Sequence, residues 1–420
     1  MCRPAKDRIV IDRCAGKRKT LNMTKISANF LQDVGARSII AALAAAGGET
    51  RFVGGCVRDA IVGLRAVDID LATTLLPEKV LDVLTAAGFT ARPLGAAHGV
   101  VSAWYSKKRY EIATLREDIA TDGRHALVAY TQDWAVDARR RDFTINALST
   151  DLNGQVYDYV GGLDDLRTQC VRFIGEASTR IHEDYLRILR YYRFHARFGT
   201  KWDAVARGAC RENRMGLAQL SRERITEELH KLLSIENPQE KILAACAAMH
   251  EDQIFLNIIP ELKDILTLER LLAREKIYDQ QSWLLRLAAW GGQAPQFDER
   301  FLDQFVFTRT DRADIKLFAT LDFGKLNHAL YYHGTNAVRA AVILRASDSD
   351  LSSLMQQIEF STPHEFPLQA EDLLQMGVLP GPRLGEILRT VENWWLENNC
   401  LANADECRTY ATTLAMVSSA

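Results

Sequence analysis

The sequence RFVGGCVRDAIVGLRAVDIDLATT, residues 51–74, decides how the rest of the chain is interpreted. An apolar run ends at the glycine pair Gly54-Gly55, and Asp68 and Asp70 follow thirteen and fifteen residues after the second glycine. Because a β-strand alternates its faces, a strand through this segment would point both aspartates the same way, about 7 Å apart. Three apolar residues that alternate with them would face a core: Val67, Ile69 and Leu71.

Two neighbouring carboxylates predict a cation at this strand. Each carboxylate raises the pKa of the other unless a positive charge lies between them. Mg²⁺ suits such a site, since it takes oxygen ligands, keeps several waters and usually works with substrate phosphates. The glycines leave no Cβ in the way, so backbone N–H groups can approach a triphosphate. The segment therefore indicates a phosphate cradle and a metal-binding strand; an exposed acidic edge strand beside an ordinary turn is the alternative.

Spaced in this way, Gly54, Gly55, Arg58, Asp68 and Asp70 resemble motif A of the class II tRNA nucleotidyltransferases. That family comprises the CCA-adding enzymes of bacteria and eukaryotes, together with bacterial poly(A) polymerases. The resemblance implies that the two aspartates hold two Mg²⁺ ions and act in catalysis. It also implies that the two glycines and the arginine bind the incoming nucleotide.

The composition sets limits on the other possibilities. A chain of 420 residues is too long for one ordinary core, so about two to four domains are expected. With 47% hydrophobic and 25% charged residues, it is typical of soluble globular protein. No apolar run approaches the roughly 20 residues needed to span a membrane. The formal net charge is −2, so nucleic-acid binding must use local basic patches.

The eight cysteines are scattered without a Cys-x-x-Cys pair, which argues against a zinc site and a disulfide framework. We therefore expect a cytoplasmic location. Residues 1–22 are basic and show no periodicity, so a disordered arm and a weak organellar targeting segment are both compatible with them. We favour a folded protein that begins at Met23, preceded by an extension without structure.

The segments that flank the opening stretch alternate between helical and strand patterns. Helical spacing covers residues 27–46, 57–64 and 77–87, and strand patterns cover residues 99–105 and 109–114. On the last strand Glu111 stands where the family's third acidic residue tends to lie, so it is a candidate to complete the metal site or to polarise the attacking hydroxyl. A surface pair with a basic neighbour is the alternative. Residues 117–137 match the flexible loop between motifs in the resembled enzymes, a loop without its own structure.

Residues 139–148, RRRDFTINAL, give the second strong signal. They resemble the family's motif B at Arg140, Arg141, Asp142 and Asn146. Guanidinium groups can clamp phosphate, while the aspartate and the asparagine can bind ribose hydroxyls. An exposed helix start capped by the aspartate is the alternative.

A helical run from Thr179 carries Glu183, Asp184, Arg187 and Arg190. Offsets of three and four place the last three along one helix face. The run resembles the family's base-selecting motif, Glu-Asp-x-x-Arg; an exposed helix with internal ion pairs is the alternative.

The chemistry of the bases supports this resemblance. Cytosine and adenine both present an acceptor ring nitrogen beside an amino donor, which Arg187 and Asp184 would match. Uracil and guanine present the opposite order and would leave the two side chains unpaired, at a cost larger than one lost contact. The two side chains would thus replace a nucleic-acid template.

Two segments further along the chain also resemble parts of this family. Residues 221–233 resemble motif E, whose Arg222 and Arg224 are expected to brace the base-selecting helix. Residues 373–388 resemble a helix–hairpin–helix turn, in which Gly381 and Gly385 would let a helix N-terminus approach an RNA phosphate beside Arg383. An ordinary turn between packed helices is the alternative, and Trp394 and Trp395 are expected in the core.

The predicted fold class is α+β, a small mixed α/β nucleotidyltransferase head followed by an all-helical neck, body and tail. We place the head at residues 23–170, the base-selecting neck at 171–237, and the tRNA-binding body and tail at 238–420. The predicted function is a CCA-adding enzyme that builds the tRNA 3′ end from CTP and ATP. No membrane and no protein partner is indicated.

Three rival functions share these motifs. A poly(A) polymerase has the same head, although Ala97-His98-Gly99 is more similar to the CCA-adding version. Partial enzymes add only CC or only A, and the segment 117–137 argues against CC-only addition. A catalytically silent RNA-binding protein is the rival from another class, against which the intact Asp68 and Asp70 argue.

Overall fold

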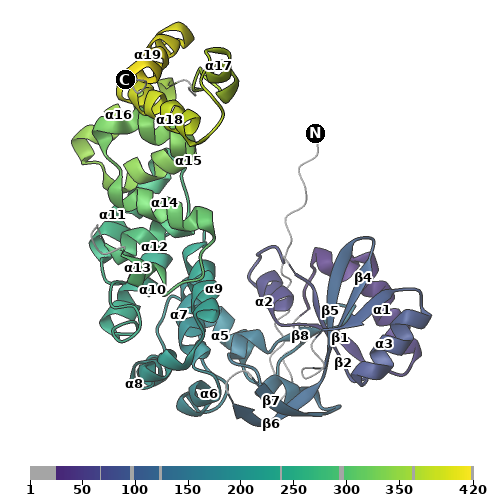
Figure 1. Ribbon diagram of the computed structural model, residues 1–420. Coiled ribbons are helices and arrows are strands. Elements are labelled where there is room, and N and C mark those ends of the chain that lie inside the picture. Colours follow the sequence, from purple (N-terminus) through teal and green to yellow (C-terminus); the bar gives the residue numbers. More distant parts are fainter. Residues whose placement is uncertain are drawn as a thin grey trace, which may run out of the picture. The chain divides into compact units, whose positions relative to one another are not determined.

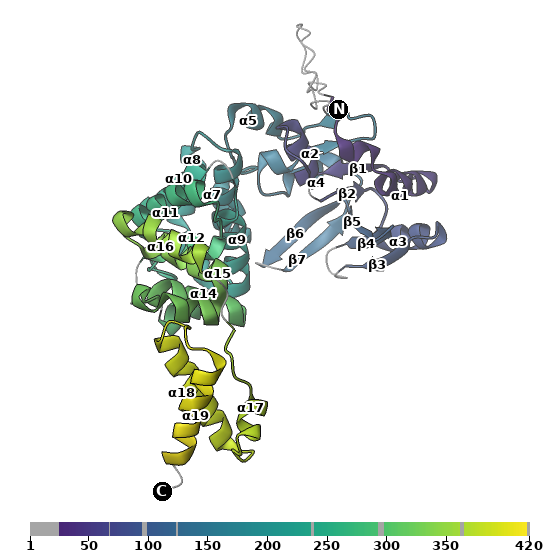
Figure 2. The same cartoon turned by 90° about the horizontal axis from the view of Figure 1, so that it is seen from above.

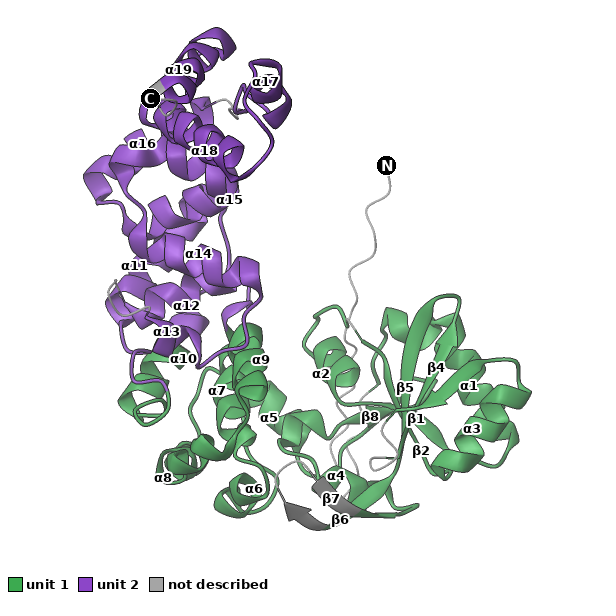
Figure 3. Cartoon of the chain, in the orientation of Figure 1, with its two compact units in different colours: residues 1–232, 244–258 green, residues 233–243, 259–420 purple. Residues whose placement is uncertain are grey.

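The computed structural model describes residues 25–66, 68–94, 99–122, 125–236, 239–292, 298–361 and 365–417. The chain divides into two compact units, residues 1–232 with 244–258 and residues 233–243 with 259–420 (Figure 3). The predicted extension at residues 1–22 and the pair Ala97-His98 lie outside the described residues.

A seven-stranded mixed sheet forms the centre of the first unit, with strand order β3-β4-β5-β2-β1-β8-β9 (Figure 1). The strands are β1 (Thr50–Val53), β2 (Asp70–Thr73), β3 (Thr90–Pro93), β4 (Val100–Tyr105), β5 (Lys108–Thr114), β8 (Ser149–Thr150) and β9 (Val156–Tyr157). Only β2 and β5 pair in parallel, and the other neighbouring strands of this sheet are antiparallel. The parallel pair brings the predicted aspartate strand beside the strand of Glu111.

Helices α1 (Val34–Ala45) and α3 (Pro77–Ala86) lie beside each other next to this sheet (Figures 1 and 2). The predicted helix over residues 27–46 is interrupted, because a short 3₁₀ helix, η1 (Asn29–Gln32), precedes α1. Asp33 separates the two in an extended conformation, and its side chain accepts a hydrogen bond from Ala36 N at 2.9 Å. An aspartate in this position starts a new helix by satisfying a free N–H group.

The prediction of a structureless loop over residues 117–137 is wrong. β6 (Arg116–Asp122) and β7 (His125–Tyr130) form a two-stranded antiparallel sheet, and α4 (Trp134–Arg139) follows. The strands pair from Arg116 opposite Tyr130 to Asp122 opposite His125, and the polar composition of the first strand is what suggested a loop.

Helices make up the rest of the first unit. They include α2 (Gly55–Ile61), α5 (Gly162–Thr168), α6 (Ala177–Glu183), α7 (Leu186–Phe198), α8 (Ala204–Glu212), η3 (Arg214–Gln219) and α9 (Arg222–Leu233), with the 3₁₀ turn η2 (Thr144–Asn146). The single helix predicted from Thr179 is in fact two, because Asp184 adopts an extended conformation between α6 and α7. Its side chain accepts a hydrogen bond from Leu186 N at 3.1 Å and so starts the second helix.

The second unit is helical throughout its described part, which confirms the predicted α+β class together with the mixed sheet of the first unit. α10 (Gln239–Glu251) bridges the boundary in sequence, and α11 (Ile265–Tyr278), α12 (Trp283–Gly291), α13 (Glu299–Leu302), α14 (Arg309–Thr320), η4 (Phe323–Lys325), α15 (Leu326–Arg345), α16 (Asp348–Phe360), α17 (Ala370–Gln375), α18 (Pro382–Glu397) and α19 (Ala404–Val417) follow. Trp395 is buried as predicted, while Trp394 is half-buried and stacks on Tyr410 at 4.7 Å between ring centroids. None of the described helices is long and apolar enough to cross a membrane.

Candidate active site

The glycine turn joins β1 to α2 and lies against the motif B segment. Gly54 has φ 67° and ψ −122°, a conformation that glycine adopts and other residues rarely do. Its N–H donates to Leu148 O at 3.0 Å, and a Cβ built on it would lie 3.4 Å from Arg141 Nη1. The turn therefore keeps backbone close to the arginines expected to bind phosphate.

The two aspartates occupy the start of β2. Asp70 is the first residue of the strand, whereas Asp68 lies before it and is exposed, so the predicted strand through both residues begins three residues too early. Ile69 and Leu71 are buried, as predicted; Val67 lies outside the described residues. In the parallel ladder Asp70 is the register partner of Glu111, so both side chains stand on the same face of the sheet.

These acids have the electrostatics of a cation site. Burial, together with the neighbouring charges of Glu111 and Asp68, raises the pKa of Asp70 to about 6, even though the charge of Arg141 lowers it. Within the described part of the chain, no group of three or more His, Cys, Asp or Glu residues is arranged to hold a metal ion. The chain thus offers the carboxylate pair, and Mg²⁺ commonly takes one or two carboxylates plus water and substrate phosphate. Glu111 itself is paired with Arg109 at 2.5 Å.

A chain of hydrogen bonds joins the predicted nucleotide-binding residues of three elements. Arg58 on α2 donates to Asn146 Oδ1 at 2.5 Å, and Asn146 Nδ2 donates to Asp142 at 3.0 Å. Arg190 on α7 donates to the other oxygen of Asp142 at 2.8 Å. Although burial alone would raise it, the charge of Arg190 and these hydrogen bonds lower the pKa of Asp142 to about 2. The network holds motif B between motif A and the base-selecting helix.

Arg140 and Arg141 are oriented by a residue that sequence reasoning missed. Asp137, buried on α4, pairs with Arg140 at 2.7 Å and with Arg141 at 3.0 Å. The charges of the two arginines lower the pKa of Asp137 despite its burial. The i, i+3 and i, i+4 spacing of these residues was a signal for this pairing.

The predicted base-selecting pair is assembled differently from the single helix face expected. Asp184 is paired with Arg224 of α9 at 2.7 Å, so this arginine does brace the segment. Arg187 is paired with Glu183 and donates to Arg180 O at 2.6 Å. Because Asp184 lies between two helices, its carboxylate is positioned by α9 and by the start of α7.

One pocket of about 660 Å³ brings these parts together. It is lined by Asp68 and Asp70 and by every predicted nucleotide-binding residue: Gly54, Gly55, Arg58, Arg140, Asp142, Asn146, Asp184, Arg187 and Arg190. Glu111, a predicted catalytic residue, is not among the described residues that line this pocket.

Sequence reasoning missed several lining residues: Arg116, Asp118, Arg193, Phe194 and Lys231. Arg193 follows Arg187 and Arg190 at a spacing of three, and this spacing could have identified it. It pairs with the buried Glu228 at 2.6 Å, and its guanidinium lies 4.2 Å from the Phe194 ring centroid.

The predicted RNA-binding turn lies in the second unit. Gly381 has φ 151° and directly precedes α18, and a Cβ on Gly381 or on Gly385 would meet no atom within 4 Å among the described residues. Arg383 Nη2 donates to Ala415 O on α19 at 2.9 Å. The turn therefore has an open backbone at the start of a long helix.

Protein-family models match two parts of the chain. The poly A polymerase head domain matches residues 50–172, and the probable RNA and SrmB-binding site of polymerase A matches residues 203–266. These ranges include the sheet with the aspartates and helix α9 with Arg224.

Similar proteins extend over most of the chain. It is 32% identical to CCA tRNA nucleotidyltransferase 1, mitochondrial, of Danio rerio over 375 residues, which cover 85% of this chain and 86% of that protein. The human protein of the same name is 32% identical over 86% of both chains. The CCA-adding enzyme of Streptococcus pyogenes is 32% identical, over 84% of this chain and 90% of that enzyme.

Solved structures share the fold. The Bacillus stearothermophilus CCA-adding enzyme in complex with CTP has a TM-score of 0.71 and 23% identity, covering 94% of this chain and 99% of that one. The Thermotoga maritima CCA-adding enzyme complexed with tRNA has a TM-score of 0.60 and 19% identity, covering 90% and 94%.

Proposed function

Because the chain belongs to the CCA tRNA nucleotidyltransferase family, we propose that the 660 Å³ pocket is where it joins CTP and ATP to the 3′ end of tRNA. The chain is a nucleotidyltransferase whose substrates are tRNA, CTP and ATP. One observation carries the proposal: the carboxylates of Asp68 and Asp70 line the same pocket as Asp184 and Arg187. Metal-binding and base-reading groups are thus provided in one site.

Asp68 and Asp70 are proposed as the residues that hold Mg²⁺. The raised pKa of Asp70 supports this, since both its burial and the nearby charges of Glu111 and Asp68 disfavour a carboxylate that no cation compensates. When bound there, two Mg²⁺ ions would activate the RNA 3′-hydroxyl and stabilise the pyrophosphate that leaves. Glu111 stands beside Asp70 in register, and its proposed catalytic role is to polarise the attacking hydroxyl.

The remaining residues are proposed to fix the nucleotide. In the reaction the 3′-hydroxyl oxygen bonds to the α-phosphorus of the nucleotide, and the bond from that phosphorus to pyrophosphate breaks. Arg140, held by Asp137, would face the phosphates together with Gly54 and Gly55. Asp142 would accept hydrogen bonds from ribose hydroxyls, and Asn146 would donate to them or accept from them.

Base choice is proposed to depend on Asp184 and Arg187. The carboxylate accepts from the exocyclic amine of cytosine or adenine, and the guanidinium donates to the ring nitrogen. Because Arg224 and Glu183 hold these two side chains, they cannot readily turn to suit uracil or guanine. One pocket can then accept both CTP and ATP.

The metal assignment is tested with Asp68→Ala and with Asp164→Ala as a control. Asp164 is an exposed aspartate of the same unit that pairs with Arg167 on the surface. Asp68→Ala is expected to abolish addition of both nucleotides while tRNA binding stays near normal, and Asp164→Ala is expected to change neither. Normal addition by Asp68→Ala would overturn the metal site.

We also propose an organisation into head (23–170), neck (171–237), and body and tail (238–420), in which Gly381, Arg383 and Gly385 contact RNA.

We also propose a cytoplasmic location, which is to be tested directly because the zebrafish and human relatives are named mitochondrial. Imaging of a C-terminal fluorescent fusion of the full chain would decide it. Mitochondrial signal that disappears when residues 1–22 are deleted would show that this segment is a targeting sequence.

A further inference from the structure

Arg180 contacts both halves of the proposed nucleotide site without lining its pocket. It lies on α6, and its side chain is only 11% exposed. One end of its guanidinium donates to the backbone carbonyl oxygens of Arg140 and Arg141, the latter at 2.7 Å. The other end donates to both carboxylate oxygens of Glu183, at 2.7 and 2.5 Å.

The backbone of Arg180 reaches the base-reading side. Its carbonyl oxygen accepts a hydrogen bond from Arg187 Nη1 at 2.6 Å, and the same nitrogen is paired with Glu183. Arg187 therefore has two fixed acceptors, and Arg180 either provides or orients each of them.

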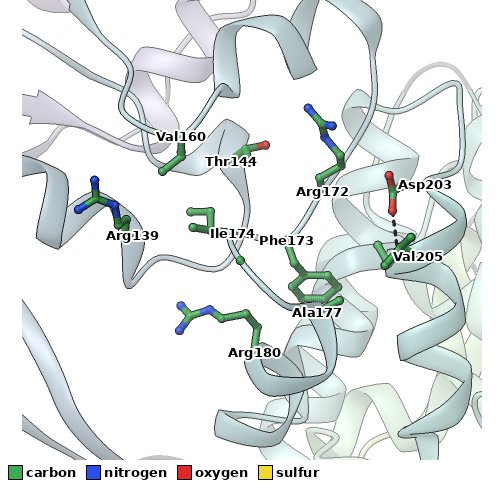
Figure 4. Close-up of a pocket in the computed structure, with 12 residues that line it drawn as sticks. Arg139, Thr144, Val160, Arg172, Phe173, Ile174, Ala177, Arg180, Asp203 and Val205 are labelled. Atoms are coloured by element: carbon green, nitrogen blue, oxygen red, sulfur yellow. Dashed lines mark hydrogen bonds between the residues drawn. The ribbon is translucent and has the colours of Figure 1, made fainter.

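The motif B arginines are held from two directions by these contacts. Asp137 binds the side chains of Arg140 and Arg141, and Arg180 binds their backbone carbonyls. Two hydrogen bonds from one guanidinium to consecutive carbonyls fix the peptide plane between them more firmly than a single contact. Figure 4 shows that Arg180 extends along a second pocket, of about 780 Å³, which also contains Arg139 and Arg172 and none of the predicted site residues.

We propose that Arg180 is a positioning residue that keeps the base-reading Arg187 in register with the phosphate-binding Arg140 and Arg141. The inference rests on the proposed function, because it assumes that these arginines have the roles assigned above. Loss of the Arg180 side chain frees Glu183, and with it Arg187, and at the same time frees the motif B backbone. A base that is correctly hydrogen-bonded to Arg187 then no longer places its triphosphate against Arg140 and Arg141.

The experiment measures kcat and KM for CTP, and the incorporation of UTP relative to CTP, with the full chain and a tRNA that lacks its CCA end. The variants are Arg180→Gln, Arg187→Ala and their combination. Arg214→Gln is the matched control, since Arg214 also donates to a backbone carbonyl, that of Arg211, at 2.6 Å, and is absent from the residues that line either pocket.

Arg180→Gln is expected to raise KM for CTP and the UTP fraction about tenfold each, as for the loss of charge-assisted hydrogen bonds. The control should match the wild type. In the double variant the two effects on the UTP fraction should be less than additive in free energy, because both changes release the same side chain. If Arg180 only stabilised the fold, Arg180→Gln would lower the melting temperature and leave the UTP fraction unchanged.

Two different results separate failure of the inference from failure of the proposed function. If Arg187→Ala relaxes base choice and Arg180→Gln, still folded, does not, the inference is wrong while the base-reading assignment stands. If Arg187→Ala leaves base choice intact, the proposed base-reading site itself is wrong. Arg180→Lys tests the geometry, because a single ammonium cannot bridge two carbonyls and a carboxylate as a planar fork does, and it should rescue little.

Discussion

Asp184 lies 2.7 Å from Arg224, a residue forty positions away on α9, while the neighbouring Arg187 is paired with Glu183. The two side chains proposed to read a base are therefore each fixed by a partner of opposite charge. Both members of the Asp184–Arg224 pair are about one-fifth exposed, so the pair is shielded enough to hold its geometry.

Removal of Arg224 should loosen base choice. Arg224→Gln is expected to raise UTP incorporation relative to CTP about three- to tenfold, since Asp184 loses one hydrogen bond to a charged partner. The change should be smaller than that in Arg187→Ala, which removes a reading group outright. The measurement is single-nucleotide addition with each triphosphate, and Arg167→Gln, from an exposed pair with Asp164, is the control. Unchanged selectivity in Arg224→Gln would show that base reading does not depend on the Asp184–Arg224 pair.

Gly54 should be needed for activity as well as for the fold. Gly54→Ala places a Cβ at φ 67° beside Arg141 Nη1, with a backbone cost of about 1–3 kcal/mol. Gly63 is a matched control, because its φ of 76° is similar and a Cβ there would meet no described atom within 4 Å. Both alanine variants should unfold at lower urea concentration, but only Gly54→Ala should lose at least about tenfold in kcat/KM for CTP. Equal activity of the two variants would argue against a phosphate cradle.

Asp142 should make the stability of the first unit depend on pH in the acid range. Its pKa is about 2 in the folded chain and 3.8 ordinarily, so the ion pair with Arg190 stabilises the fold fully above about pH 4. That contribution, about 2 kcal/mol, is lost as the pH falls toward 2. Urea unfolding at stepped pH should show a steeper acid loss for the wild type than for Asp142→Asn, with Asp164→Asn as the control. Identical slopes in all three would mean that the buried pair does not form.

Arg383 should contribute to tRNA affinity and to no other step. Arg383→Gln is expected to weaken tRNA binding several-fold and to reduce the slope of log affinity against log salt by about one, as for the loss of one phosphate contact. Arg389→Gln makes the same change of charge on the same helix, about one and two-thirds turns further on, and should have a smaller effect. Filter binding of tRNA at several salt concentrations provides the measurement. Equal losses in the two variants would point to general charge rather than to the turn at Gly381.

Short sequence patterns predicted the features of the site that a single short segment determines. The alternation of polar and apolar residues around Asp70 predicted a strand there, although β2 begins three residues later than predicted, and the glycine turn at Gly54 lies where the pattern indicated. The side chains of motif B meet in one pocket because a short segment carries them all.

What could not be predicted depends on contacts between distant segments. The pairing of Asp184 with Arg224 breaks a helix that periodicity alone would continue, and Tyr185 packs where a Cβ on Gly216 would lie 2.0 Å from its ring. The parallel pairing of β2 with β5 sets Glu111 beside Asp70, which no local pattern encodes. The hairpin over β6 and β7 was missed because the polar composition of β6 is typical of a loop and the pairing of the two strands is not encoded in either one alone.

The most direct test of the central claim is to incubate the protein with Mg²⁺, CTP, ATP and a tRNA that ends at the base before CCA, and then to sequence the 3′ ends. Ends that read CCA and extend no further are predicted, with no product in Asp68→Ala. A ragged adenosine tail, arrest at CC, or addition of A only to an existing CC end would contradict the account of one pocket that serves both CTP and ATP.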